Sequence, residues 1–475
     1  MDEDIALYAV TYARERGAEY AEARLQSDEG FAATFKNGKL ETYATMVKEG
    51  IGVRVLVEGS LVFASSNTLT REKIRELIDK AVKRAKAISS KLRGGTRLSE
   101  EAASKAKWRA ELKQDPLDVP VDERLSVFKE VERELKDYVT LLPSRMYEIE
   151  AFKTRKFVVN SDGSEIFGER PSIYFSYSIL AFQAGKGSVH RWSELGSSKG
   201  WEVLREWDVP GRVLQETKVM LKILEEARSP PSEEIDVILG SEVVGLIVHE
   251  SCGHPSEADR ILGREAAQAG ESYMRSDMKG SRIGSKHVTI SDDPTIPGSY
   301  GFYLYDDEGI KARKRVLFKE GVVNEFLHNR ETASVFGVRS NAAARASSFD
   351  REPIVRMANT YFEPGDYTFE ELVEDIKRGV YIKSFMEWNI DDRRWNQRYV
   401  GLEAYLIERG EVKGLVRNPA LEVTTGGLYE SVDAVGKELK FYAGVCGKGD
   451  PMQAVPVWVG GPEVRVRGVR LSLSL

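Results

Sequence analysis

Residues 249–255 read His-Glu-Ser-Cys-Gly-His-Pro, and this stretch places two of the chain's five histidines five positions apart. Neutral imidazoles are good zinc ligands, and a carboxylate beside a bound metal can act as general base on a metal-bound water. On a regular helix, positions i and i+5 lie about 140° apart, so His249 and His254 would point in different directions. A shared metal therefore requires a widened turn, such as the π-bulges that helices often carry at functional sites.

The residues around this stretch predict the helix that carries it. Gly253 supplies backbone freedom just before the second histidine, and Pro255 disfavours helical geometry at His254. We therefore predict a helix over about residues 242–252 that widens or ends at the second histidine. Residues 235–239 are apolar and predict a short buried strand immediately before it.

The N-terminal half alternates between helical and strand-like patterns. Asn37-Gly38 predicts a hairpin turn, and residues 161–163 (Ser-Asp-Gly) predict another in a similar local context, which suggests a faint internal repeat. Residues 89–120 mix charges and glycines and predict a surface excursion or a linker. The predicted helices are residues 4–16, 70–85, 123–135 and 212–227, and the predicted strands are 31–35, 40–47, 50–57, 61–65, 147–160, 164–168 and 173–183.

The predicted fold class is α+β. Residues 229–232 (Ser-Pro-Pro-Ser) break the pattern, so we predict an N-terminal helix-plus-β-meander domain over residues 1–228 and a β-rich domain over 232–475 that carries the metal-site helix. The C-terminal half is rich in strand patterns. Its clear exception is a helix predicted over residues 369–378, with a capping box formed by Thr368 and Glu371 and a C-cap at Gly379.

Composition limits the class of protein. The chain has 475 residues and a net charge of −6, and no basic patch or tail stands out, which argues against nucleic acid as the main partner. The acidic start lacks the basic region of a secretory signal, and the apolar runs are too short to cross a bilayer. Two cysteines far apart predict no disulfide scaffold. We expect a soluble cytoplasmic protein that does not act at a membrane.

Two histidines leave a catalytic zinc site one ligand short, since such sites usually have three protein ligands and one open position. Cys446 lies in a glycine-flanked loop and is a chemically suitable third ligand, although a free cysteine more commonly serves as a small buried hydrophobe. Glu257, three residues after His254, competes for the same role as a ligand or as a carboxylate that anchors an imidazole.

The remaining candidates are weaker on spacing alone. A ligand at Cys252 would crowd the turn that already holds both histidines, so packing against the buried side of the helix is the favoured interpretation. Asp259 could orient a ligand imidazole or be a surface charge. His190, His287 and His328 have no partner at metal-ligand spacing and are expected to be structural.

Glu250 directly follows the first histidine, as the catalytic glutamate does in zinc peptidases. Zinc lowers the pKa of a bound water towards about 7 and stabilises negative charge on a carbonyl oxygen. Glu250 would take the proton of that water and pass it to the leaving amine. The sequence therefore predicts hydrolysis of a peptide bond with Glu250 as general base.

Residues 248–259 (Val-His-Glu-Ser-Cys-Gly-His-Pro-Ser-Glu-Ala-Asp) resemble the signature of the TldD/PmbA family, and specifically its TldD-type, metal-binding branch. The resemblance is strong from about residue 235 onward and looser before it. Further similar segments are residues 306–309 (Asp-Asp-Glu-Gly), 318–323, 356–359 (Arg-Met-Ala-Asn), 446–449 (Cys-Gly-Lys-Gly), 455–457 (Val-Pro-Val) and 460–462 (Gly-Gly-Pro). Residues 391–398 and 450–454 depart from the family pattern, and the first of these is bulkier and more basic than the family leads us to expect.

The resemblance implies an intracellular zinc metallopeptidase that cleaves unfolded or short peptides with little side-chain selectivity. It implies His249, His254 and Cys446 as the zinc ligands and Glu250 as the catalytic base. It also implies a dimer, either with a PmbA/TldE-like paralogue that lacks the metal motif or with a second copy of the chain. The alternatives are a noncatalytic assembly subunit with a structural metal and an indirect regulator of a DNA topoisomerase.

Overall fold

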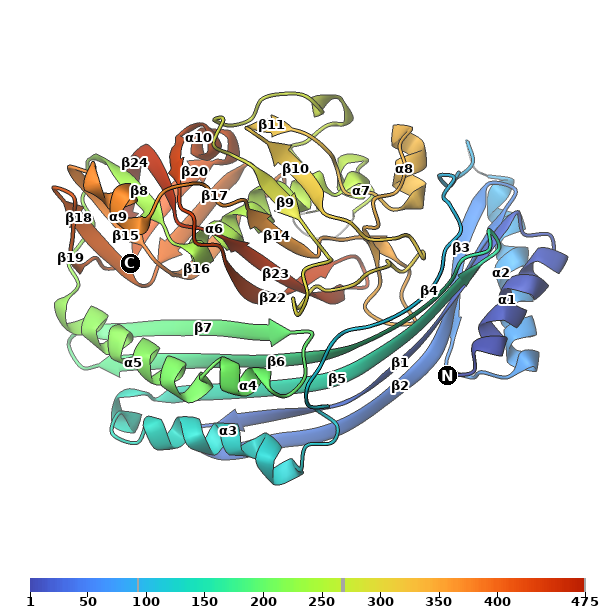
Figure 1. Ribbon diagram of the computed structural model, residues 1–475, viewed down its shortest axis with the longest axis horizontal. Helices are drawn as coiled ribbons and strands as arrows, with labels where there is room; N and C mark the ends of the chain where they lie inside the picture. Colours follow the sequence, from blue (N-terminus) through green and yellow to red (C-terminus); the bar gives the residue numbers. More distant parts are fainter. Residues whose placement is uncertain (92–93, 266–269, 474–475) are drawn as a thin grey trace.

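The computed structural model describes residues 1–91, 94–265 and 270–473. Figure 1 shows a long, curved sheet built by the N-terminal half, with the C-terminal half seated against its inner side. The mixture of helices and sheets confirms the predicted α+β class. Within the described residues, no helix combines the length and the apolar character that crossing a membrane requires.

The N-terminal sheet has the strand order β3-β2-β1-β5-β6, and β4 and β7 both pair with β6. Its strands are β1 (Tyr20–Lys36), β2 (Lys39–Val57), β3 (Ser60–Ser66), β4 (Lys105–Arg109), β5 (Ser144–Asn160), β6 (Glu165–Gln183) and β7 (Gly187–Ser197). The turn at Asn37-Gly38 is confirmed, and both residues have the positive φ that a tight hairpin needs. The segment that was expected to be an excursion or a linker contains β4, which pairs in parallel with β6.

The strands are longer than predicted. The expected strands 40–47 and 50–57 form one strand, and so do 164–168 and 173–183. Gly50 lies inside β2, and the ring of Phe349 from the C-terminal half occupies the place where its side chain would be. This glycine therefore permits a close approach between the two halves.

Two pairs of helices cover different parts of this sheet. α1 (Glu3–Glu15) and α2 (Arg71–Ser89) pack on the end that contains β3, and α3 (Val121–Glu134) and α5 (Val209–Glu226) pack on the other end, near the short α4 (Val203–Glu206) (Figure 1). The order helix, three strands, helix thus occurs twice along the chain. Each helix pair encloses its own apolar core.

The C-terminal half contains a six-stranded and a nine-stranded sheet. In spatial order the first consists of β11 (Val322–Val323), β10 (Arg315–Lys319), β9 (Ile290–Asp292), β14 (Asn359–Phe362), β23 (Gln453–Gly461) and β22 (Lys440–Lys448). The second consists of β16 (Phe385–Ile390), β17 (Asn396–Gly401), β20 (Pro419–Thr424), β24 (Val464–Leu473), β8 (Glu234–Leu239), β15 (Arg378–Ile382), β18 (Ala404–Glu408) and β19 (Glu411–Leu415), with β21 (Val432–Val435) beside β24. The smaller elements are β12 (Ala344–Arg345), β13 (Ile354–Val355), α7 (Ala258–Ile261), α8 (Arg330–Phe336), α9 (Phe369–Glu374) and α10 (Thr425–Glu430).

Helix α6 (Ser241–Val248) connects these two sheets. It follows β8 of the nine-stranded sheet and packs against β14, β22 and β23 of the six-stranded sheet. A side chain on Gly245 would collide with the backbone of Val459 and Gly460, so helix α6 and strand β23 are in close contact there. The C-terminal apolar core surrounds α6, which fixes the end of the helix in space.

One predicted helix ends earlier than expected. The capping box of Thr368 and Glu371 is present, but α9 stops at Glu374, and Gly379 is not its C-cap. Gly379 instead lies in β15, where a Cβ would collide with the carbonyl of Asp236 on the paired strand. The glycine therefore serves strand packing and not helix termination.

Candidate metal centre

The predicted widening of the helix is present in the structure. α6 continues into a π-helical turn over His249–Gly253 and then into a short 3-10 turn over His254–Ser256. The widened turn brings the imidazole rings of His249 and His254 to 4.7 Å between centroids. Gly253 has an ordinary helical φ of −59°, so the expected need for backbone freedom is wrong. Glycine is needed for space, because a Cβ there would overlap the sulfur of Met357.

Cys446 lies beside the two histidines. It is carried by β22, and its Sγ is 3.4 Å from Nε2 of His254. One donor atom from each of His249, His254 and Cys446 lies within 4.8 Å of the other two. All three side chains are buried. The structure thus brings together the three residues that the sequence and the family resemblance indicated.

The chemistry of this cluster fits a zinc ion. Two imidazoles and a thiol form a common zinc donor set with one position left open. Nδ1 of His249 is buried and has no hydrogen-bond partner among the described residues, a costly state for a polar atom. Burial would raise the pKa of the Cys446 thiol, but the positive charges of His254, Arg356 and His249 outweigh burial and hold this pKa well below its usual range. A thiolate is the form that binds metal.

Glu257 hydrogen-bonds to the ring nitrogen of His254 that does not contact Cys446. Its Oε2 accepts a hydrogen bond from Nδ1 of His254 at 3.0 Å and another from Arg260 at 2.7 Å. Burial opposes its ionisation, but Lys448, His254 and Arg260 hold the pKa of Glu257 well below its usual range. A proton on Nδ1 leaves the lone pair of Nε2 free on the side of Cys446. Glu257 therefore acts as the imidazole anchor, one of its two expected roles.

The other candidates lie apart from the cluster. Asp259 accepts two hydrogen bonds from Nζ of Lys448, at 2.7 and 2.8 Å, so the expectation that it might orient an imidazole is wrong. Cys252 is fully buried in the C-terminal apolar core, as its spacing predicted. His328 is buried against Thr332, and burial lowers its pKa to about 4, which is typical of a structural histidine.

Glu250 forms a buried ion pair with Arg394. Arg394 lies between β16 and β17 with a φ of +61°, and it belongs to the unusually basic segment 391–398. Burial raises the pKa of Glu250, but the charges of Arg394, His254 and His249 outweigh burial and lower it overall. Glu250 is therefore ionised at neutral pH. Sequence reasoning noted the segment but missed Arg394, because no spacing rule links residues 144 positions apart.

A cavity of about 260 Å³ opens in front of the cluster. The lining includes Trp192 and Glu194 of β7 from the N-terminal sheet and residues 443–447 of β22. Figure 1 shows β22 next to β7, in agreement with the contacts between these strands. β22 is the last strand of its sheet in the described part of the chain, so its outer edge lacks a strand partner. The cavity is also lined by Phe385, Trp388, Tyr442, Val457 and Val459.

The chain matches three family models along most of its length. Residues 21–85 match PmbA/TldA metallopeptidase domain 1, residues 114–232 match the central domain, and residues 232–473 match the C-terminal domain. A metalloprotease of Methanocaldococcus jannaschii is 32% identical over 447 residues, which cover 94% of this chain and 96% of that protein. A zinc metalloprotease TldD homologue of Saccharolobus solfataricus is 30% identical over 338 residues, or 70% of this chain and 73% of that protein.

Solved structures share the fold. The crystal structure of TldE from Thermococcus kodakarensis superposes with a TM-score of 0.73 at 18% identity and covers 99% of both chains. A Thermotoga maritima protein described as a candidate modulator of a DNA gyrase superposes with a TM-score of 0.79 at 16% identity, over 99% of this chain and all of the other. At these identities the likeness establishes the architecture alone.

Proposed function

Because the chain belongs to the PmbA/TldD metallopeptidase family, we propose that it is a zinc-dependent peptidase. The observation that carries this proposal is the meeting of His249, His254, Cys446 and Glu250 at one cavity. A closed structural zinc site usually has four protein ligands. This cluster offers three and faces a cavity, which favours catalysis over a purely structural metal.

In the proposed mechanism, His249, His254 and Cys446 would hold the metal. A zinc ion bound there would act as a Lewis acid that activates water and stabilises negative charge. Glu250, kept ionised by Arg394, accepts a proton from the attacking water and delivers it to the leaving amine. Glu257 fixes the orientation and the tautomer of His254. The ion pair with Arg394 holds the carboxylate of Glu250 in place.

We propose unfolded or short peptides as substrates. An extended peptide can add to the free edge of β22 through main-chain hydrogen bonds, which are the same for every side chain. Aromatic and aliphatic side chains of the cavity give apolar contact, and Glu194 and Glu242 add two carboxylates to the lining. The main-chain hydrogen bonds support cleavage with little side-chain selectivity.

The decisive experiment is the Glu250→Gln substitution. This variant should retain zinc but lose peptide cleavage by at least about a hundredfold, because a general base contributes on the order of 10²–10⁴ to the rate. Metal analysis and cleavage of an unstructured peptide give the two readouts. Glu422→Gln changes an exposed carboxylate on β20 and should leave both unchanged. Full cleavage by Glu250→Gln would show that the base is another group.

We further propose a cytoplasmic dimer, either with a PmbA/TldE-like paralogue or with a second copy. The shared architecture with TldE supports a common mode of assembly. Light scattering of the purified chain, alone and mixed with such a paralogue, distinguishes the two arrangements. A monomer under both conditions would contradict this part of the proposal.

A further inference from the structure

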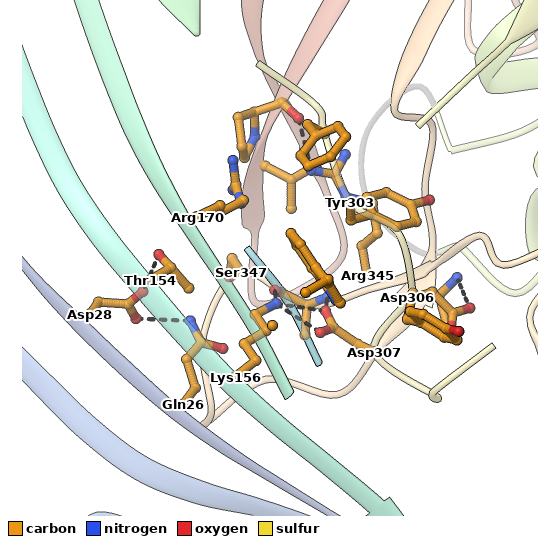
Figure 2. Close-up of a pocket in the computed structure, with 18 of the residues that line it drawn as sticks. Gln26, Asp28, Thr154, Lys156, Arg170, Tyr303, Asp306, Asp307, Arg345 and Ser347 are labelled. Atoms are coloured by element: carbon orange, nitrogen blue, oxygen red, sulfur yellow. Dashed lines mark hydrogen bonds and ion pairs between the residues drawn. The ribbon is translucent and has the colours of Figure 1, made fainter. Parts of the chain in front are cut away.

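A second cavity, of about 100 Å³, lies between the N-terminal sheet and the C-terminal half. Figure 2 shows Lys156 and Arg170 reaching it from β5 and β6, and Arg345 reaching it from β12 on the other side. Trp108, Phe302 and Tyr303 contribute aromatic walls, and the rings of Trp108 and Phe302 meet edge to face. Neither the predicted metal ligands nor Glu250 line this cavity.

The two guanidinium groups at this cavity lack acidic partners. Among the described residues, neither Arg170 nor Arg345 has a carboxylate within ion-pair distance. Arg170 donates one hydrogen bond, to the carbonyl of Tyr300 at 3.2 Å. Arg345 donates to the carbonyls of Met357 and Pro456. Arginine carries five N–H donors and stays charged, so both groups keep unused capacity to bind an anion.

The acidic residues around the cavity already have partners. Asp307 accepts two hydrogen bonds from Lys156, at 2.8 and 2.9 Å, and one from the amide of Ala346. Asp306 accepts hydrogen bonds from three backbone amides, those of residues 308, 310 and 344. Asp28 accepts from Gln26 and Thr154, as the dashed lines in Figure 2 show. None of these carboxylates forms an ion pair with Arg170 or Arg345, although Asp307 attracts both guanidinium groups through space.

The pKa values of both arginines are lower than usual, as expected for cations that have no ion-pair partner. Burial lowers the pKa of Arg170. Burial, together with repulsion from Arg170 and Arg356, lowers the pKa of Arg345 to about 10. Two neighbouring cations, one buried and one partly buried, that repel each other would be stabilised by an anion placed between them. Arg24 lies nearby, and its Nη1 is 3.9 Å from Oδ2 of Asp307, so its charge is paired.

We propose that this cavity binds a small oxyanion, a carboxylate or a phosphate group, through Arg170 and Arg345. Arginine pairs with both groups through parallel hydrogen bonds. Cavities for drug-sized ligands measure roughly 300–1,000 Å³, so this one admits only the anionic group and a few further atoms. The aromatic walls would contact the apolar part of such a ligand. This site is separate from the proposed peptidase site.

Calorimetric titration of the purified full chain tests the proposal. Inorganic phosphate and acetate are titrated separately, with sodium chloride holding the ionic strength constant. We expect saturable binding of one anion per chain for at least one probe. Binding of phosphate alone identifies a phosphate site, and binding of acetate alone identifies a carboxylate site. No saturable binding of either anion would overturn the proposal.

Variants assign the binding to this cavity. Arg170→Gln should weaken it at least about tenfold, because it removes a charge-assisted contact. Arg155→Gln is the matched control: Arg155 precedes Lys156 on β5 but pairs with Glu169 outside the cavity, so it should change the affinity less than about twofold. Equal weakening by both variants would overturn the site.

A third variant tests the cavity without removing a positive charge. Ser347→Leu fills part of the cavity and leaves every cation in place, so it should also abolish binding. Circular dichroism and zinc content of each variant report whether it has folded. If Ser347→Leu folds and binds the anion as tightly as the wild type, the cavity is not the site.

Discussion

Burial of a single carboxyl group, that of Glu194, brings its pKa close to neutral pH. It lines the larger cavity, and burial raises its pKa to about 7 although Tyr174 donates a hydrogen bond to it. A carboxyl group whose pKa is raised on folding binds its proton more tightly in the folded state. Its stabilising contribution is therefore complete below the ordinary pKa, near 4.5, and is lost as the pH rises through about 7.

Glu194→Gln removes this dependence because the amide carries no charge at any pH. We expect the variant to be more stable than the wild type at pH 8, by about 1–3 kcal/mol, and to differ less at pH 5. Urea unfolding at both pH values measures the effect. Glu422→Gln, an exposed carboxylate, serves as control, and identical pH dependence in the two variants would contradict the assignment.

Sequence spacing predicted the residues of the candidate site that lie close together in the chain and missed one that lies far away. His249, Glu250 and His254 are adjacent enough for spacing to predict their roles, and Glu257 was recognised as an anchor candidate because it lies one helical turn away. Arg394 contacts Glu250 from 144 positions along the chain. Such a contact depends on the tertiary fold, which no local pattern records.

At the scale of elements, the π-helical turn depends on Gly253. A methyl group there would overlap Met357, so Gly253→Ala should destabilise the fold by about 1–3 kcal/mol and displace His254. Urea unfolding and zinc content measure both effects. Gly414→Ala in β19 is the matched control, because a Cβ there meets no atom within 4 Å. Normal stability and zinc content in Gly253→Ala would show that the turn accommodates a side chain.

The elements were predicted unevenly for physical reasons. The widened turn followed from a five-residue spacing that a regular helix does not satisfy, and the hairpin at Asn37-Gly38 followed from turn chemistry. Gly379 misled the prediction of a helix end, because glycine at a close contact looks the same in sequence as glycine at a C-cap. The residue that it contacts, Asp236, lies far away in sequence.

At the scale of the whole molecule, the proposed metal would join α6 to β22. A ligand that binds only the folded state stabilises it, by about 2.7 kcal/mol at a hundredfold excess over Kd. Removing zinc with a chelator should therefore lower the melting temperature measured by calorimetry. Restoring zinc should reverse the change, and an unchanged melting temperature would show that the metal does not bridge these elements.

Cysteine variants assign that effect to one residue. Cys446→Ala should lose most of the bound zinc and show little response to the chelator, since the third donor is missing. Cys252→Ala is a suitable control because Cys252 is buried in the apolar core, so that variant should keep its zinc. Equal zinc content in Cys446→Ala and the wild type would remove Cys446 from the ligand set.

The separation between His254 and Cys446 also has a consequence for biosynthesis. The two residues lie 192 positions apart, and a ribosome adds residues at about 5–20 per second. The helix with both histidines is therefore complete roughly 10–40 seconds before Cys446 is made. During that interval the nascent chain carries a proposed metal site that still lacks its third ligand. The order of synthesis would thus keep the proposed peptidase inactive until the C-terminal strands have been made.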